Sequence, residues 1–170
     1  MNARRAAALT GFAFAASSIA ATAAVNMPKE GNLDFNYCLA GRTQAMPVSD
    51  DTVAGSFELT AAIISNIPGG PFDGQGSQCM GTWQVLDGKY SDSGYCVTVD
   101  ADGDKFLMNF KTGPVPAGEL ATGTWTAVGG SGKYQGMMAK ASYKAIRAVA
   151  PAVPGGFQGC NRNTGTYKLK

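Results

Sequence analysis

Short stretches in which apolar and polar residues alternate run through most of the chain, and turn-forming residues separate them. A period of two is typical of β-strands with one buried face. The pattern predicts strands over residues 34–45, 53–65, 77–86, 95–100, 105–111, 118–128, 135–144 and 161–169. No amphipathic helix is predicted between them. We therefore expect an all-β fold, either a sandwich or a closed barrel of eight antiparallel strands.

The dipeptide Asp87-Gly88 is a two-residue turn signal and predicts the first of two consecutive hairpins. Counting outward from this turn places Cys79 opposite Cys96 at a non-hydrogen-bonded site. Cα atoms at such sites lie about 4.5 Å apart, which a disulfide can span. We expect a Cys79–Cys96 disulfide, unless residues 91–94 form a bulge that shifts the register.

The dipeptide Asp102-Gly103 predicts the second hairpin by the same turn chemistry. A two-residue turn there places three apolar pairs on one face: Tyr95 with Phe110, Val97 with Met108, and Val99 with Phe106. The alternative reading of Asp100, Asp102 and Asp104 is a fragment of a calcium loop, but the rest of the twelve-residue motif is missing. The sequence thus favours a hairpin over a metal site.

The N-terminal segment has the features of a signal peptide. Arg4 and Arg5 precede an uncharged stretch over residues 6–20, and small residues follow up to Ala24. The stretch is too short and too rich in alanine for a membrane anchor. We expect residues 1–24 to be removed on export to the periplasm or the medium, and residues 25–170 to form a single domain.

Charge and cysteine content narrow the classes of function. Two of the 14 basic residues lie in the N-terminal segment, so 12 remain against 12 acidic residues, which argues against nucleic acid and anionic membranes as partners. The four cysteines predict two disulfides in an oxidising compartment, the second joining Cys38 to Cys160. With no histidine in the chain, catalysis of the Ser-His-Asp or Cys-His type is excluded. We expect no metal site and no cofactor.

A few residues are candidates for a site inside a hollow barrel. Glu58 points to the opposite face from Phe57 and Leu59. It would suit general acid or base chemistry if that face is the cavity, and it is an ordinary surface acid if that face is solvent. The candidate ligand-binding residues are the large apolar ones, which can equally form a packed core: Trp83, Tyr95, Val97, Phe106, Met108, Phe110 and Trp125.

The segment 129–136, Gly-Gly-Ser-Gly-Lys-Tyr-Gln-Gly, resembles the glycine-rich signature of the allene oxide cyclase and dirigent barrel superfamily. The triplet Gly123-Thr124-Trp125 precedes it. Residues 94–105 are similar to a sequence pattern of bacterial secreted relatives, in which Gly-x-Cys is followed by Asp-x-Asp-Gly-Asp. Ala139 and Ala141 depart from the family, which often has glycines there.

The resemblance implies an eight-stranded antiparallel barrel that binds an apolar small molecule and forms trimers. It assigns no catalytic residue. We therefore expect a non-enzymatic binder of a small apolar molecule. The alternatives are a cofactor-independent isomerase or cyclase of an unsaturated lipid-like substrate, and a structural or envelope-interaction protein.

Overall fold

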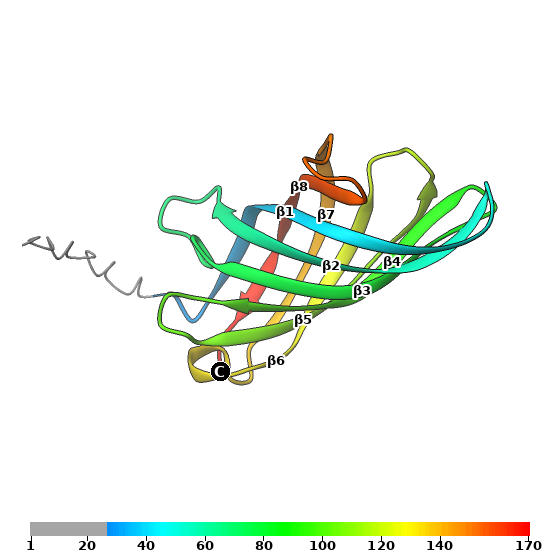
Figure 1. Cartoon of the computed structure of the whole chain (residues 1–170). Helices are drawn as coiled ribbons and strands as arrows, with labels where there is room; N and C mark the ends of the chain where they lie inside the picture. The colour runs from blue at the N-terminus through cyan, green and yellow to red at the C-terminus, as the bar shows by residue number, and fades with distance from the viewer. Residues whose placement is uncertain (1–26) are drawn as a thin grey trace, which may run out of the picture.

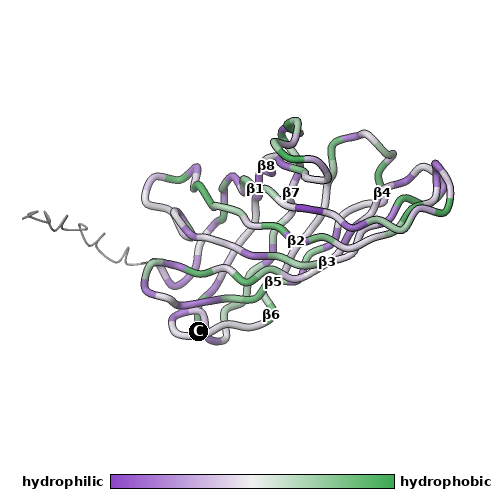
Figure 2. The backbone as a smooth tube through the Cα atoms, in the orientation of Figure 1, coloured by the Kyte–Doolittle hydropathy of each residue, from purple (hydrophilic) through white to green (hydrophobic). Residues whose placement is uncertain are grey.

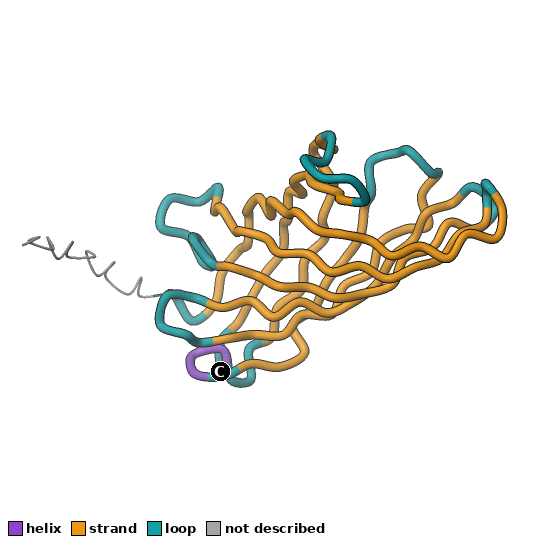
Figure 3. Tube along the Cα trace, in the orientation of Figure 1, coloured by secondary structure: helices purple, strands orange, loops and turns teal. Residues whose placement is uncertain are grey.

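A computed structural model describes residues 27–170, so the expected signal peptide lies outside the described residues. Eight strands and one short 3₁₀ helix follow one another along the chain (Figure 1, Figure 3). They are β1 (Glu30–Ser49), β2 (Thr52–Ser65), β3 (Gly76–Leu86), β4 (Lys89–Val99), β5 (Lys105–Pro116), β6 (Thr122–Gly130), η1 (Gly132–Tyr134), β7 (Met138–Val149) and β8 (Gly156–Lys168). All eight predicted strands are present, most of them longer than predicted.

The strands form a closed barrel in which each strand pairs with its sequence neighbours. All pairs are antiparallel, and β1 closes the barrel against β8. Hydrophobic and hydrophilic residues interleave along the strands (Figure 2). This is the alternation expected when one face of each strand points into a barrel. The prediction of an all-β, eight-stranded antiparallel barrel is confirmed.

The two ends of the barrel differ. One end carries the β1–β2, β3–β4, β5–β6 and β7–β8 connections, and we call it the open end. The other carries the remaining loops and η1, and we call it the closed end. In Figure 1 the β1–β2 and β3–β4 hairpins reach far beyond the other strands at the open end.

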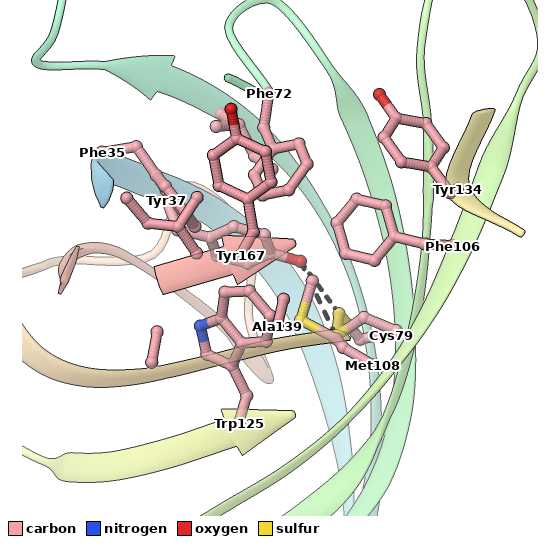
Figure 4. Close-up of a cluster of buried hydrophobic side chains, with 14 of the residues drawn as sticks. Phe35, Tyr37, Phe72, Cys79, Phe106, Met108, Trp125, Tyr134, Ala139 and Tyr167 are labelled. Atoms are coloured by element: carbon pink, nitrogen blue, oxygen red, sulfur yellow. Dashed lines mark hydrogen bonds between the residues drawn. A yellow bond between two sulfur atoms is a disulfide. The ribbon is translucent and has the colours of Figure 1, made fainter. Parts of the chain in front are cut away.

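Packed aromatic rings fill the closed end (Figure 4). Phe72, from the β2–β3 loop, lies 4.9 Å from Phe106 and 6.0 Å from Tyr134, measured between ring centroids. Phe35 packs edge-on against Phe72. The Gln75 side chain donates a hydrogen bond of 2.7 Å to the Tyr134 hydroxyl and so ties the loop to η1. These rings separate the barrel interior from solvent at this end.

Two disulfides staple the barrel, as predicted. Cys79 and Cys96 are direct partners in the β3–β4 ladder, with Cα atoms 4.0 Å apart, and their side chains face inward. No bulge interrupts this ladder. Cys38 and Cys160 are partners between β1 and β8, with Cα atoms 4.1 Å apart. This second disulfide locks the seam where the first and last strands meet.

The predicted register of the β4–β5 hairpin is wrong by one residue. Phe106 pairs with Thr98 and Met108 pairs with Cys96, whereas Val97 pairs with Leu107. Because the side-chain period of a strand is two, a slip of one residue moves a whole set of side chains to the other face. Tyr95 and Val97 therefore face outward.

The cause is a longer turn than the two-residue one predicted. The Asp100 carboxylate accepts hydrogen bonds from the backbone N–H groups of Asp102 and Asp104, and so organises a five-residue loop between Val99 and Lys105. Aspartate side chains often accept hydrogen bonds from the backbone N–H groups of a turn in this way. Gly103 takes a φ of +84° within the loop.

Among the described residues, no helix is long and apolar enough to cross a membrane.

Candidate functional site

The barrel interior holds a cavity of about 500 Å³ that extends from its middle to the open end. Its walls are mainly aromatic and aliphatic. The side chains that line its apolar part come from all eight strands: Phe35, Tyr37, Leu39, Phe57, Leu59, Cys79, Trp83, Cys96, Met108, Phe110, Trp125, Tyr143 and Phe157. A volume of this size accommodates a small organic molecule.

A continuous row of paired positions crosses the cavity wall from β3 to β7. Trp83 pairs with Asp92, Asp92 with Thr112, Thr112 with Gly123, and Gly123 with Tyr143. Paired residues of neighbouring strands point to the same face. The register thus gathers one carboxylate, one threonine hydroxyl and one tyrosine on a wall that is otherwise apolar.

Gly123 creates the space in which Tyr143 lies. A Cβ atom at this position would collide with the phenol ring of Tyr143 and with the carbonyl oxygen of Lys111. Without it, Tyr143 reaches from β7 across β6, and its hydroxyl makes a short hydrogen bond with the Thr112 hydroxyl on β5. Burial raises the pKa of Tyr143 well above its usual range, so this hydroxyl stays neutral beyond the pH at which an exposed tyrosine ionises.

Asp92 is the carboxylate of this wall. The Tyr90 hydroxyl donates a hydrogen bond to Asp92 Oδ2. Asp92 Oδ1 is buried and has no hydrogen-bond partner among the described residues. Burial, and then the charge of Asp92, raise the pKa of Tyr90 well above its usual range. The phenol therefore remains a proton donor beside the carboxylate.

The indole of Trp83 supplies a second unpaired polar atom. Its Nε1–H group is buried without an acceptor among the described residues. The ring lies over Gly55 of β2, where a Cβ atom would approach Nε1 to 2.7 Å. Trp83 and Asp92 both line this part of the cavity, and each has one buried polar atom without a partner among the described residues.

The inner part of the cavity has its polar groups already paired. The hydroxyl of Tyr37 lies 3.0 Å from Cys79 Sγ, against the inward-facing disulfide (Figure 4). Burial raises the pKa of Tyr37 to about 12. Trp125 Nε1 donates a hydrogen bond of 2.9 Å to Asn163 Oδ1. This inner part offers a ligand mainly apolar surface.

The mouth of the cavity lies at the open end. Glu119 and Leu120 from the β5–β6 loop, with Arg147 from β7 and Gln158 from β8, complete the lining there. Glu119, Leu120 and Arg147 are exposed to solvent. A molecule would thus enter past a mixed polar rim and pack against apolar walls.

Four of the predicted ligand-binding residues line this cavity: Trp83, Met108, Phe110 and Trp125. Phe106 is buried as well, but it belongs to the packed closed end. Tyr95 and Val97 are 55% and 42% exposed on the outer face, so their predicted place in the interior is wrong, for the register reason given above.

Glu58 lies on the outer face of β2, exposed to solvent and paired with Arg42 of β1. Of the two placements that the sequence allowed, the structure has the surface one. The three aspartates of the β4–β5 loop contact Lys133 and do not line the cavity. Lys133 Nζ lies 2.8 Å from carboxylate oxygens of both Asp100 and Asp102. Asp104 accepts a hydrogen bond from the Lys133 backbone N–H.

The sequence reasoning missed the polar wall around Asp92. A signal for it was present, because Asp92 is four residues from Cys96 and therefore shares its face of β4. The first hairpin, once its register is set by the disulfide, also places Asp92 opposite Trp83. Tyr143 could not be found in this way, since its contact with Thr112 depends on how β5 pairs with β6 and β6 with β7.

No protein-family model matches the sequence, and no curated protein matches it either. A similar fold is found among solved structures, in the pterocarpan synthase dirigent protein GePTS1. The alignment has a TM-score of 0.52 and covers 86% of this chain and 95% of that one, at 8% sequence identity. At this identity the likeness concerns the fold alone. The chain therefore has a dirigent-like β-barrel fold.

Proposed function

We propose that the protein binds one small apolar molecule inside the barrel and does so without catalysis. The observation that carries this proposal is the cavity of about 500 Å³ with aromatic and aliphatic walls. Ligand sites in proteins are typically of this size and character, with a few polar groups that orient the ligand. The polar side chains of the wall, Asp92, Thr112 and Tyr143, are such groups here.

The architecture supports retention of a ligand. An eight-stranded barrel has an interior just large enough either to be filled by side chains or to hold one small ligand. Here the closed end is filled by the rings around Phe72, and the open end is hollow. A molecule that enters from the open end would lose its contact with water without displacing the core.

A cavity-filling variant tests the proposal. N-phenyl-1-naphthylamine, a neutral apolar probe whose fluorescence increases in apolar surroundings, should bind with a stoichiometry of one. Met108→Trp adds an indole to the cavity wall and should weaken binding at least tenfold. Met80→Trp makes the same change on the outer face, where Met80 is 67% exposed, and should leave the affinity unchanged.

Two results would contradict the proposal. One is that the probe does not bind the wild-type protein, and the other is that both tryptophan variants bind it equally. Near-ultraviolet circular dichroism of each variant separates lost binding from lost folding.

A second candidate function rests on Asp92 and its neighbours. A carboxylate inside a cavity, next to the Tyr90 and Tyr143 hydroxyls, is suited to proton transfer. In an unsaturated ketone, Asp92 would take a proton from the carbon between the carbonyl group and the double bond. A tyrosine hydroxyl would hydrogen-bond the enolate oxygen. The proton would return to the γ carbon, at the far end of the original double bond. The double bond would then be conjugated with the carbonyl group, which completes a cofactor-independent isomerisation.

This candidate is tested by the ultraviolet absorbance of the conjugated product from a small β,γ-unsaturated ketone. Asp92→Asn should abolish turnover, and Glu58→Gln, which removes a carboxylate from the outer face, should not change it. Binding of the ketone without turnover would leave only the binding function.

Export and self-association complete the proposal. Two disulfides and the N-terminal sequence support export, and the mass of the exported form should correspond to a chain that begins near Val25. Met80, Tyr95 and Val97 form an exposed apolar group on the outer face of β3 and β4, which supports contact between copies. Sedimentation analysis should find the trimer that the sequence resemblance implies, and a monomer would contradict it.

A further inference from the structure

Asp92 is an incompletely satisfied acid inside an apolar cavity. One carboxylate oxygen accepts a hydrogen bond from Tyr90, and the other is buried with no partner among the described residues. Burial of a carboxylate is costly unless hydrogen bonds or an opposite charge compensate it. Because the Asp92 side chain also lines the cavity, a bound molecule can supply the compensation that the described residues lack.

Residues 27–170 supply no cation to this carboxylate. None of the four ion pairs formed by residues 27–170 includes Asp92. Glu119 and Arg147 are the other charged residues that line the cavity, and both are solvent-exposed at its mouth. Lys89 and Lys111, which lie near Asp92 in the ladders, are exposed on the outside. The negative charge of Asp92 is thus free to act on the cavity contents.

Aromatic rings surround the same position. Trp83 is the direct cross-strand partner of Asp92, and Tyr90, Phe110 and Tyr143 line the cavity next to it. The faces of such rings carry partial negative charge and attract cations, indole most strongly. A carboxylate together with aromatic faces is the combination that binds an organic ammonium group.

We infer that the molecule bound by this cavity is an apolar amine in its protonated form, with its ammonium group at the Asp92 carboxylate and its apolar body toward Met108 and Trp125. This inference rests on the proposed binding function and specifies its ligand class. An ammonium group donates a hydrogen bond and neutralises the carboxylate. A hydroxyl group would donate the hydrogen bond but leave the charge, and a carboxylate ligand would be repelled.

Three probes with the same ring system test the inference: 1-naphthylmethylamine, 1-naphthalenemethanol and 1-naphthoate. Calorimetric titration of the wild-type protein at pH 7 should find the amine bound at least tenfold more tightly than the alcohol, and the carboxylate weakest. Asp92→Asn should remove this preference while the affinity for the alcohol changes less than threefold. Glu58→Gln removes an outer-face carboxylate and should leave the preference intact.

The possible results separate the two proposals. Equal or weaker binding of the amine than of the alcohol overturns the inference, but binding of the alcohol leaves the proposed function in place. A preference for the amine that persists in Asp92→Asn also overturns it. If 1-naphthylmethylamine does not bind, the inference is overturned, whether or not N-phenyl-1-naphthylamine binds. If N-phenyl-1-naphthylamine does not bind, the proposed binding function itself is overturned.

A second measurement covers the case in which Asp92→Asn does not fold. The carboxyl carbon resonance of Asp92 in the wild-type protein should shift when the amine is added, and should shift much less with the alcohol. No shift on saturation with the amine would overturn the inference.

Discussion

Gly123 leaves the space through which Tyr143 crosses β6 to reach Thr112. We predict that Gly123→Ala lowers the free energy of unfolding by about 1 to 3 kcal/mol, because an added methyl group in a tight site forces neighbouring atoms to move. Urea unfolding checks this. Gly129→Ala is the matched control, since a Cβ atom there meets nothing within 4 Å. Equal effects of the two substitutions would contradict the account.

Tyr37 makes stability depend on alkaline pH. Burial raises its pKa from 10.0 to about 12 in the folded protein, whereas the unfolded chain releases this proton near the ordinary value. Unfolding therefore releases a proton above pH 10, and the stability present below pH 10 is lost as pH rises toward 12. Tyr37→Phe should make the free energy of unfolding less dependent on pH in this range. An unchanged pH dependence would contradict the assignment.

Residue-scale features could be predicted from the sequence only where they depend on strand alternation. The outward or inward direction of Glu58 was left open, because alternation alone does not say which face of β2 is inside. Asp92 follows from its spacing to Cys96, once the disulfide marks the inner face. The contact of Tyr143 with Thr112 needs the registers of two successive strand pairs, β5 with β6 and β6 with β7, which local sequence does not set.

The β1–β8 seam depends on the Cys38–Cys160 disulfide. This disulfide closes a loop with a sequence separation of 122 residues, against 17 for Cys79–Cys96. Cross-links that close longer loops restrict the unfolded chain more, which predicts a loss of about 4 to 5 kcal/mol for the double substitution of Cys38 and Cys160 by serine. Chemical denaturation in the absence of reductant measures this loss. A loss below about 1 kcal/mol would contradict this role of the seam.

At the scale of elements, the two hairpins show what local sequence can decide. The first was predicted correctly because Asp87-Gly88 forms the turn itself, and both residues take positive φ angles there. The second was predicted one residue out of register because the Asp100 side chain organises a longer loop around Gly103. Turn composition alone does not distinguish a two-residue turn from a longer loop. The inward-facing Cys96 does, because it places its neighbours Tyr95 and Val97 on the outer face.

The molecule as a whole is a barrel closed at one end by aromatic packing and hollow at the other. The sequence predicts apolar inward faces, but such faces are the same for a packed core and for a cavity wall. The difference arises from where large side chains meet. Phe72, Phe106 and Tyr134 converge from three separate segments at the closed end, and no comparable group among residues 27–170 fills the region around Met108 and Trp83.

Ligand binding should stabilise the whole barrel. A ligand that binds only the folded state at 100 times its Kd adds about 2.7 kcal/mol to the free energy of unfolding. We predict this increase for the wild-type protein with N-phenyl-1-naphthylamine at that concentration. Met108→Trp, at the same probe concentration, should show a much smaller increase. Equal stabilisation of both proteins would indicate binding elsewhere.

The central claim is that the barrel is closed at one end and binds a ligand through the other. Its most direct test is a crystal structure of the mature protein with N-phenyl-1-naphthylamine. The account predicts electron density for one probe molecule among Trp83, Met108, Phe110 and Trp125, with the closed end unchanged. Density for the probe only on the outer face, or a barrel whose side chains have collapsed to fill the cavity, would contradict it.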